Sequence, residues 1–164
     1  MKQFIALYFF FIALLFVLFY FPTSPMATLL NDGQTKLTLF FLSKFLEPEQ
    51  LRGIDIWINP QYKIIITQAC NGMIPILFLF ASILAYPSGH ITKFLWMLLG
   101  YILFSLVNVF RLLFVVHVTQ TGKGFSDFYW SHDLVGNALL MMTGVGLFIG
   151  FVKTASKGKN SKTF

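Results

Sequence analysis

Three residues of this chain could carry out nucleophilic chemistry together: the only cysteine, Cys70, an arginine inside an apolar segment, Arg111, and His132. A thiolate is a strong nucleophile, an imidazole can protonate a leaving amine, and a guanidinium can stabilise an oxyanion. Such a set favours acyl transfer through a thioester. A single cysteine excludes an internal disulfide and a cysteine metal cluster, and we expect no metal, nucleotide or organic cofactor.

The composition indicates that these residues belong to a membrane protein. The 164 residues are 57% hydrophobic and 11% charged, and the mean hydropathy is +0.75. Soluble domains have about 25% charged residues. The formal net charge is +6, but a cluster of lysines lies in the C-terminal tail, directly after an apolar segment. This position indicates orientation in a lipid bilayer and argues against a nucleic-acid partner.

Apolar segments predict the fold class, which is an all-α integral membrane protein with a single domain over residues 1–164. The expected bundle of about four transmembrane helices has spans at about 4–21, 71–86, 94–118 and 134–152. The first span exceeds the usual apolar length of a signal peptide, so we interpret it as a retained anchor. The second span is short unless its helix begins near Asn71, which Pro75 in the first turn supports.

Residues 22–69 form a polar-faced excursion between the first two spans. Apolar side chains at helical spacing within 31–46 predict a short helix along the membrane interface, with Asn31 or Asp32 as its cap. Two β-branched runs around the turn signal at 59–61 predict a small β-hairpin.

The distribution of basic residues predicts the orientation. With four spans, Lys2, the short loop that contains Lys93 and the basic tail all lie on one side of the membrane. The excursion and the loop at 120–133 carry no basic excess. Both termini are therefore expected to be cytoplasmic, and the excursion is expected to be extracytoplasmic.

This topology places Cys70, Arg111 and His132 at the same membrane face, from three different spans. A charged residue within a span costs about 2.5 to 3.5 kcal/mol on insertion scales, so Arg111 needs a partner or a route to the surface. It could snorkel to lipid phosphate, or it could bind within the bundle, where Asn108 shares its helical face.

Neighbouring residues are expected to support the three candidates. A helix N-terminus and a nearby cation favour the thiolate of Cys70, and Asn71 and Gly72 lie at that helix start. Ser131 and Asp133 flank His132 and are natural cap residues for the fourth span.

Two other histidines compete with His132 for the catalytic role. His117 projects about 120° away from Arg111 around the third span. His90 lies on the membrane side opposite Cys70. Both are therefore weaker candidates than His132.

Three motifs resemble those of a known family: ACNG around Cys70, NVFR ending at Arg111, and HDLVG beginning at His132. In this order, and at the matching ends of spans, they resemble the exosortase/archaeosortase family of membrane cysteine transpeptidases, most closely the exosortase H type. The resemblance covers about residues 60 to 150. It implies that Cys70 is the nucleophile, Arg111 the stabilising cation and His132 the proton-transfer residue.

The resemblance also implies a substrate and a location. The substrate would be a secreted protein whose C-terminal tail has a short motif, one hydrophobic helix and a basic end. Cleavage would occur at the extracytoplasmic face of the bacterial cytoplasmic membrane and leave a thioacyl-enzyme. The chain departs from many members in having about four spans where they have about eight, and in lacking an arginine shortly after the cysteine.

An alternative function is a non-enzymatic membrane component, such as a small transporter subunit or an assembly factor. Arg111 would then pair with Asn108, and Cys70 would pack as a small apolar residue. A thiol redox role would need a second cysteine or an intermolecular partner. The alternatives differ in whether Cys70→Ala abolishes function.

Overall fold

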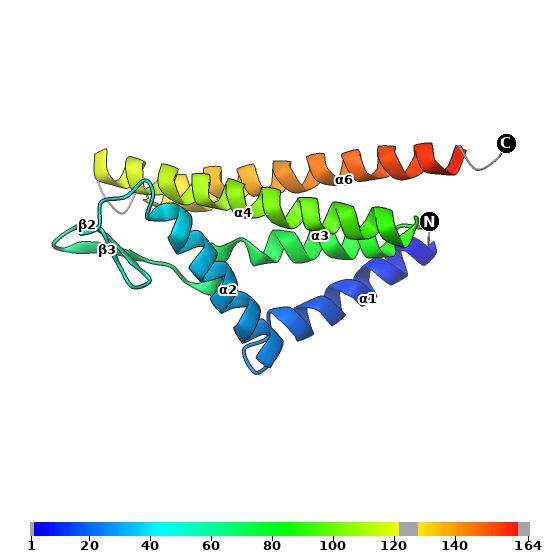
Figure 1. Ribbon diagram of the computed structural model, residues 1–164, viewed down its shortest axis with the longest axis horizontal. Coiled ribbons are helices and arrows are strands. Elements are labelled where there is room, and N and C mark those ends of the chain that lie inside the picture. Colours follow the sequence, from blue (N-terminus) through cyan, green and yellow to red (C-terminus); the bar gives the residue numbers. More distant parts are fainter. Residues whose placement is uncertain (1, 122–127, 161–164) are drawn as a thin grey trace.

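The computed structural model describes residues 2–121 and 128–160 of the chain. The protein is elongated and mainly helical, with a small sheet at one end (Figure 1). Its helices are α1 (Lys2–Phe19), α2 (Pro25–Leu42), α3 (Met73–Ala85), α4 (His90–Thr121) and α6 (Asn137–Asn160). A 3-10 turn, η1 (Gln68–Asn71), precedes α3, and a π-helical segment, η2 (Trp130–Gly136), precedes α6.

Three helical segments are long and apolar enough to cross a membrane: α1, α4 and residues 130–156. Helix α3 has 13 residues, about 20 Å at 1.5 Å per residue, which is shorter than the hydrocarbon layer of about 30 Å. The prediction of a helical membrane protein is confirmed. Three of the four predicted spans correspond to helices long enough to cross, and the predicted second span corresponds to α3, which is apolar but shorter, so the count of four is not confirmed.

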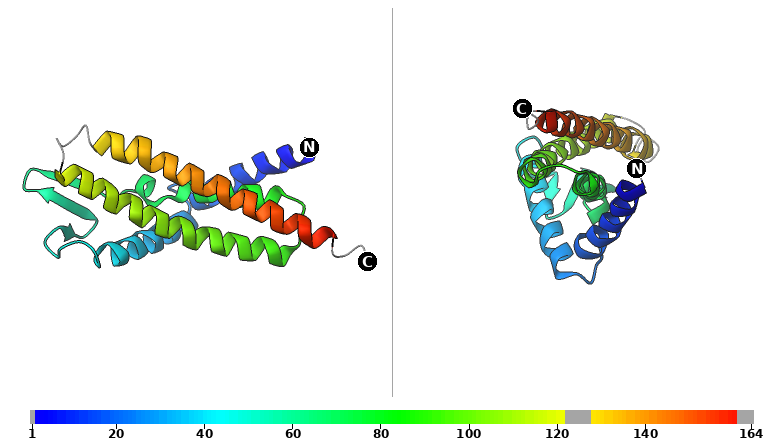
Figure 2. Two further views of the ribbon diagram at one scale, coloured as in Figure 1. Left: turned by 90° about the horizontal axis from the view of Figure 1, so that it is seen from above. Right: turned by 90° about the vertical axis from the view of Figure 1, so that its right-hand side faces the viewer.

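Helix α3 lies at the centre of the bundle. It packs against α1, α4 and α6, and the view along the long axis shows it between α1 and the α4–α6 pair (Figure 2). The apolar core here includes Met73, Ile76 and Leu77 from α3, Phe104 from α4 and Phe151 from α6. Pro75 occupies the third position of α3, where a missing backbone N–H leaves no hydrogen bond unmade.

Helix α2 differs from the short interfacial helix predicted within 31–46. It begins at Pro25, directly after its N-cap residue Ser24, and ends at Leu42. The expectation that Asn31 or Asp32 caps this helix was wrong, because both lie inside it. Proline is favoured at the first helical position, so Pro25 starts α2 as well as separating it from α1.

The side of α2 that faces the bundle carries polar as well as apolar residues. Gln34 is buried, accepts a hydrogen bond from the Tyr101 hydroxyl of α4 at 2.6 Å and donates one to Ser105 at 3.2 Å. Leu29 and Phe40 on α2 are exposed. In a membrane, lipid solvates apolar side chains, while polar groups are satisfied between helices, so this reversed pattern holds α2 against α4.

The predicted hairpin is confirmed and extended. Strands β2 (Asp55–Asn59) and β3 (Tyr62–Ile65) are antiparallel, and the pairing of Asn59 with Tyr62 leaves a two-residue loop. Strand β1 (Leu51–Arg52) adds a third, antiparallel strand. Ile56 and Ile64 pack with side chains of α4, including Val115, in a second apolar cluster.

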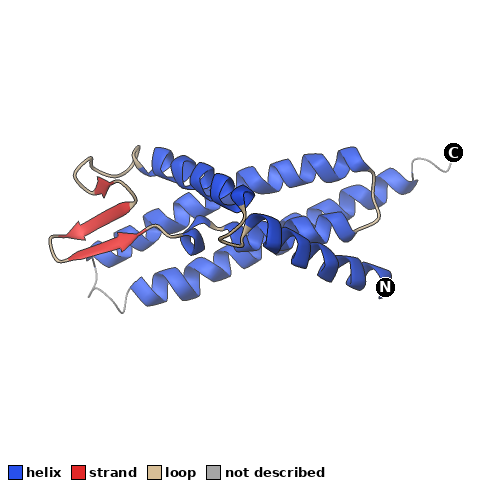
Figure 3. Cartoon of the chain, turned by 90° about the horizontal axis from the view of Figure 1, so that it is seen from below, coloured by secondary structure: helices blue, strands red, loops and turns tan. Residues whose placement is uncertain are grey.

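The first residues of α1 and the last residues of α6 lie opposite the sheet (Figure 3). We call the end of the molecule that carries β1 to β3 the sheet end. Helices α2 and α4 both end there, and η1 follows β3 closely. The sheet end is therefore where the segments that carry Cys70, Arg111 and His132 converge.

Candidate active site

Cys70 lies in the 3-10 turn between β3 and α3. Its backbone N–H donates to Thr67 at 2.9 Å, and Gly72 follows with φ +68°, which turns the chain into α3. The left-handed region disfavours side chains, and a Cβ at Gly72 would lie 3.2 Å from Cγ of Asn108. Glycine is therefore needed here both for the turn and for the close approach of α4.

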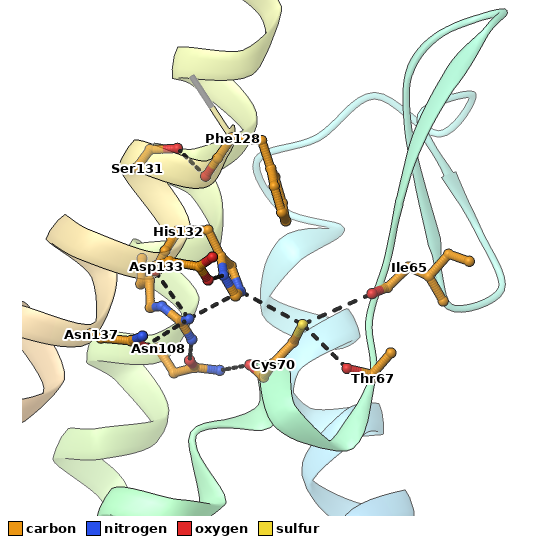
Figure 4. Close-up of polar contacts among 10 residues, drawn as sticks. Ile65, Thr67, Cys70, Asn108, Phe128, Ser131, His132, Asp133 and Asn137 are labelled. Carbon is orange, nitrogen blue, oxygen red and sulfur yellow. Dashed lines mark hydrogen bonds and ion pairs between the residues drawn. The ribbon is translucent and has the colours of Figure 1, made fainter. Parts of the chain in front are cut away.

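The Cys70 thiol is 7% exposed and contacts three groups (Figure 4). Its Sγ lies 3.7 Å from Nε2 of His132, 3.5 Å from the Thr67 hydroxyl and 3.9 Å from the carbonyl oxygen of Ile65. The thiol is thus held at the sheet end with an imidazole as one direct neighbour.

Arg111 is directed into the bundle. It is 2% exposed, and its Nη2 donates to Nε2 of His132 at 3.0 Å and approaches the side-chain oxygen of Asn137 at 3.3 Å. The snorkelling alternative was wrong, because the guanidinium is buried and its two terminal nitrogens have partners within the protein. Asn108 accepts from Nη1 of Arg111 at 3.2 Å and donates to the Cys70 carbonyl at 2.8 Å, so it links the arginine to the cysteine backbone.

His132 is positioned by the π-helical segment η2. Because arginine can only donate, Nε2 of His132 acts as an acceptor, and Nδ1 therefore carries the proton that is donated to Asp133 at 2.7 Å. Phe128 stacks on the imidazole, with ring centroids 5.0 Å apart and planes inclined by 13°. Segments of π-helix are frequent at functional sites.

The predicted capping roles of Ser131 and Asp133 were wrong. Residues 128 and 129 are already helical, and the π-helical segment follows from Trp130, so both side chains lie inside the helix. Ser131 instead donates to the carbonyl of Phe128 at 3.2 Å, and Asp133 binds His132. Capping needs a residue at the first turn of a helix, and neither side chain has that position.

Gly136 leaves room for Arg111. A Cβ at Gly136 would lie 2.5 Å from Nε of Arg111, which is closer than side chains tolerate. The same Nε is buried and has no hydrogen-bond partner among the described residues. The absence of a side chain at Gly136 therefore allows the Arg111 side chain to pass directly against the backbone of η2.

Asn71 is fully buried and supports the turn from behind. Its Nδ2 donates to Asn31 and to Thr35 of α2, at 2.7 Å in both cases. Asn71 therefore fastens η1 to α2. This explains why α2 carries polar residues on its inner side at this depth.

The surroundings of Cys70 set the acidity of its thiol. Burial raises the pKa, but hydrogen bonds to His132 and Thr67 lower it more, and the pKa of Cys70 is about 7. A large fraction of the thiol is therefore ionised at neutral pH, which is typical of cysteines that act as nucleophiles.

The structure brings together Cys70, Arg111 and His132, along with Asn108 and Asp133. Sequence reasoning missed four residues that contact them: Thr67, Phe128, Gly136 and Asn137. The HDLVG motif already contained Gly136, but the sequence alone did not show that this glycine faces Arg111.

The competing histidine His117 is exposed on α4. Among the described residues, no group of three or more His, Cys, Asp or Glu side chains could hold a metal ion.

The fold and the site define a class: a helical membrane protein with a thiol, an imidazole and a guanidinium in contact at one end. The chain belongs to the transmembrane exosortase family, whose model matches residues 2–149. That family comprises transmembrane cysteine transpeptidases. The match confirms the predicted resemblance and extends it to α1 and α2. Neither the curated proteins nor the solved structures include a significant match.

Proposed function

We propose that the chain is a cysteine protease and transpeptidase that cleaves C-terminal sorting tails of secreted proteins through a thioacyl-enzyme. The observation that carries the proposal is the alignment of Cys70, His132 and Asp133. One ring nitrogen of His132 faces Sγ at 3.7 Å, and the other binds Asp133 at 2.7 Å. This order of nucleophile, base and orienting carboxylate is the arrangement that activates a thiol.

The first half-reaction begins when the thiol proton moves to Nε2 of His132. The thiolate attacks the scissile carbonyl carbon, a C–S bond forms, and the carbonyl oxygen takes the negative charge. The C–N bond then breaks, and the leaving amine takes the proton from Nε2. The released tail keeps its new amino terminus, and the secreted protein remains attached to Cys70 as a thioester.

In the second half-reaction, an incoming water or amine loses its proton to Nε2 as it attacks the thioester. The C–S bond breaks and the thiolate leaves, paired with the protonated imidazole. Water gives a released protein, and an amine gives a transfer product. Asp133 stabilises the imidazolium in both halves because it accepts from Nδ1.

Arg111 has two tasks in this proposal. With neutral His132, its Nη2 donates to Nε2 at 3.0 Å. Once Nε2 is protonated, that bond cannot exist, and one N–H of Nη2 is released while the other stays with the Asn137 oxygen at 3.3 Å. The released N–H can then face the oxyanion, where a preorganised donor is worth about 10²- to 10³-fold in rate.

We place the reaction at the extracytoplasmic face of the bacterial cytoplasmic membrane, with both termini cytoplasmic. The proposal is supported by the grouping of Lys2 and Lys93, at the starts of α1 and α4, at the end of the molecule opposite the site. Basic residues favour the cytoplasmic side. A secreted substrate would meet the site from outside.

The test is a gel-mobility assay in cells that co-express a secreted protein carrying a tail with a short motif, an apolar helix and a basic end. We expect the wild-type chain to shorten this protein, and Cys70→Ala and His132→Ala to leave it full length at equal enzyme abundance. His117→Ala is the matched control and should retain processing. Unchanged processing in Cys70→Ala would overturn the proposal and favour a non-enzymatic membrane component.

A further inference from the structure

An apolar groove of about 720 Å³ runs along α3 and α6, with Tyr8 of α1 on its flank. Phe78 and Leu79 line it from α3. The α6 side consists of residues at helical spacing: Leu140, Met141, Gly144, Val145, Phe148 and Ile149. The groove therefore follows the direction of two membrane helices.

One end of the groove is polar and belongs to the candidate site. Gly72, Arg111 and Asn137 line this end. Arg111 also donates to His132, and Gly72 follows Cys70 by two residues. A chain segment that leaves the groove at this end thus arrives beside the reacting groups.

The α6 side of the groove is a seam that packing within the chain leaves uncovered. Met141, Val145 and Ile149 are spaced four residues apart, and they are 69%, 59% and 49% exposed. They extend over about 12 Å of helix at 1.5 Å per residue. An apolar helix laid against α3 and α6 would cover this seam.

We infer that the groove binds the hydrophobic helix of the sorting tail, an inference that rests on the proposed function. A tail helix satisfies its own backbone and needs only apolar packing, which the groove supplies. The peptide that precedes the helix has exposed backbone groups, and Arg111 and Asn137 offer a donor and an amide to them. A lipid acyl chain would use neither polar group.

The binding direction follows from this arrangement. The motif lies at the sheet end, next to Cys70, and the helix descends between α3 and α6. The basic end of the tail then emerges near Phe148 and Ile149, on the side of the chain's own termini. Recognition of the helix therefore fixes how far the scissile bond lies from the thiol.

Disulfide cross-linking can test the inference, because Cys70→Ala leaves a chain without cysteine. Into that variant we would place Met141→Cys, inside the groove, or Met142→Cys. Met142 is a neighbouring methionine of similar exposure, 74%, that does not line the groove. The partner is the secreted reporter of the gel assay, with single cysteines scanned along its apolar helix and oxidation in intact membranes.

We expect a reporter cross-link with Met141→Cys that recurs about every 3.6 tail residues, and its loss with Met142→Cys. Equal cross-linking at both positions, or none at either, would overturn the inference and leave lipid in the groove. A cross-link between two copies through Met141→Cys, without reporter, would also overturn it.

A second experiment uses the chain with Cys70 intact. Val145→Trp fills the groove and should slow shortening of the reporter through weaker binding, whereas Met142→Trp should leave the rate unchanged. The two proposals fail separately. A reporter that cross-links at Met141→Cys but is never shortened by the wild-type chain would refute cleavage and keep the groove assignment. A reporter that is shortened equally by wild type and Val145→Trp would refute the groove assignment alone.

Discussion

Nη2 of Arg111 lies 3.0 Å from Nε2 of His132, while Sγ of Cys70 lies 3.7 Å from the same nitrogen. The guanidinium of Arg111 and the thiol of Cys70 thus compete for the single lone pair on Nε2 of His132. When the thiol proton moves onto Nε2, the bond from Arg111 must break. The protonation state of His132 and the position of the guanidinium are therefore coupled, which links formation of the nucleophile to release of the oxyanion donor.

The pH dependence of thiol alkylation should report this coupling. The thiolate is the reactive form, so the alkylation rate of Cys70 should fall as the pH drops through about 7 and level off above it. In His132→Ala the hydrogen bond that lowers the pKa is lost while burial still raises it, so the midpoint should move to higher pH. Mass-tag gel shifts after alkylation at a series of pH values measure the midpoint.

The control for this experiment is His117→Ala, which removes an exposed histidine of α4 and should leave the midpoint unchanged. A midpoint that stays near 7 in His132→Ala would show that the imidazole does not set the acidity of Cys70.

The Arg111→Lys variant should be as abundant as the wild-type chain but should cleave the reporter much more slowly. A lysine keeps the positive charge, but its single nitrogen lacks the planar fork with which the guanidinium reaches Asn108 from Nη1 and His132 from Nη2. We expect normal abundance with reporter cleavage slowed by about 10²- to 10³-fold, the scale for one lost oxyanion donor. Arg52→Lys, at an exposed position on β1, is the matched control. Cleavage near the wild-type rate in Arg111→Lys would mean that charge alone is sufficient.

Gly136→Ala should act on the site through Arg111. The added Cβ would lie 2.5 Å from Nε of Arg111, and overpacking of this kind costs about 1 to 3 kcal/mol. Reporter cleavage should therefore drop while α6 still forms. Gly146→Ala meets no atom within 4 Å and should behave as wild type. If both variants cleaved equally, the contact between Gly136 and Arg111 would have no role.

Gly72→Ala should destabilise the turn that carries Cys70. A non-glycine residue in the left-handed region costs about 1 to 2 kcal/mol. Gly53 has a similar φ of +64° but open space around it, whereas Gly72 faces Asn108. Thermal unfolding in detergent should thus show a larger loss for Gly72→Ala than for Gly53→Ala. Equal losses would mean that only backbone strain matters at Gly72.

Much of the architecture was predictable because hydropathy and turn residues are local signals. The apolar segments follow from the local hydropathy of the sequence, and the hairpin follows from β-branched runs around the turn signal at 59–61. The approach of Cys70, Arg111 and His132 follows from which end of a span each occupies. None of these inferences requires side-chain orientation.

The missed features depend on rotation about helix axes. The π-helical segment changes the angle between successive side chains, so a period of 3.6 misplaces the residues after His132, including Gly136 and Asn137. Helix α2 was misread because its start was expected at Asn31 or Asp32, whereas the helix begins at Pro25. Its polar residues also seemed to face water, whereas Gln34 and its neighbours face α4.

The short helix α3 has a consequence for the depth of the site. Its 13 residues cover about 20 Å, and because α3 is surrounded by α1, α4 and α6, the longer helices can cross the bilayer while the polar turn at the start of α3 lies below the level of the headgroups. Cys70 lies just before the first residue of α3 and shares this depth. We therefore expect the proposed cleavage to take place beneath the level of the surrounding lipid phosphates.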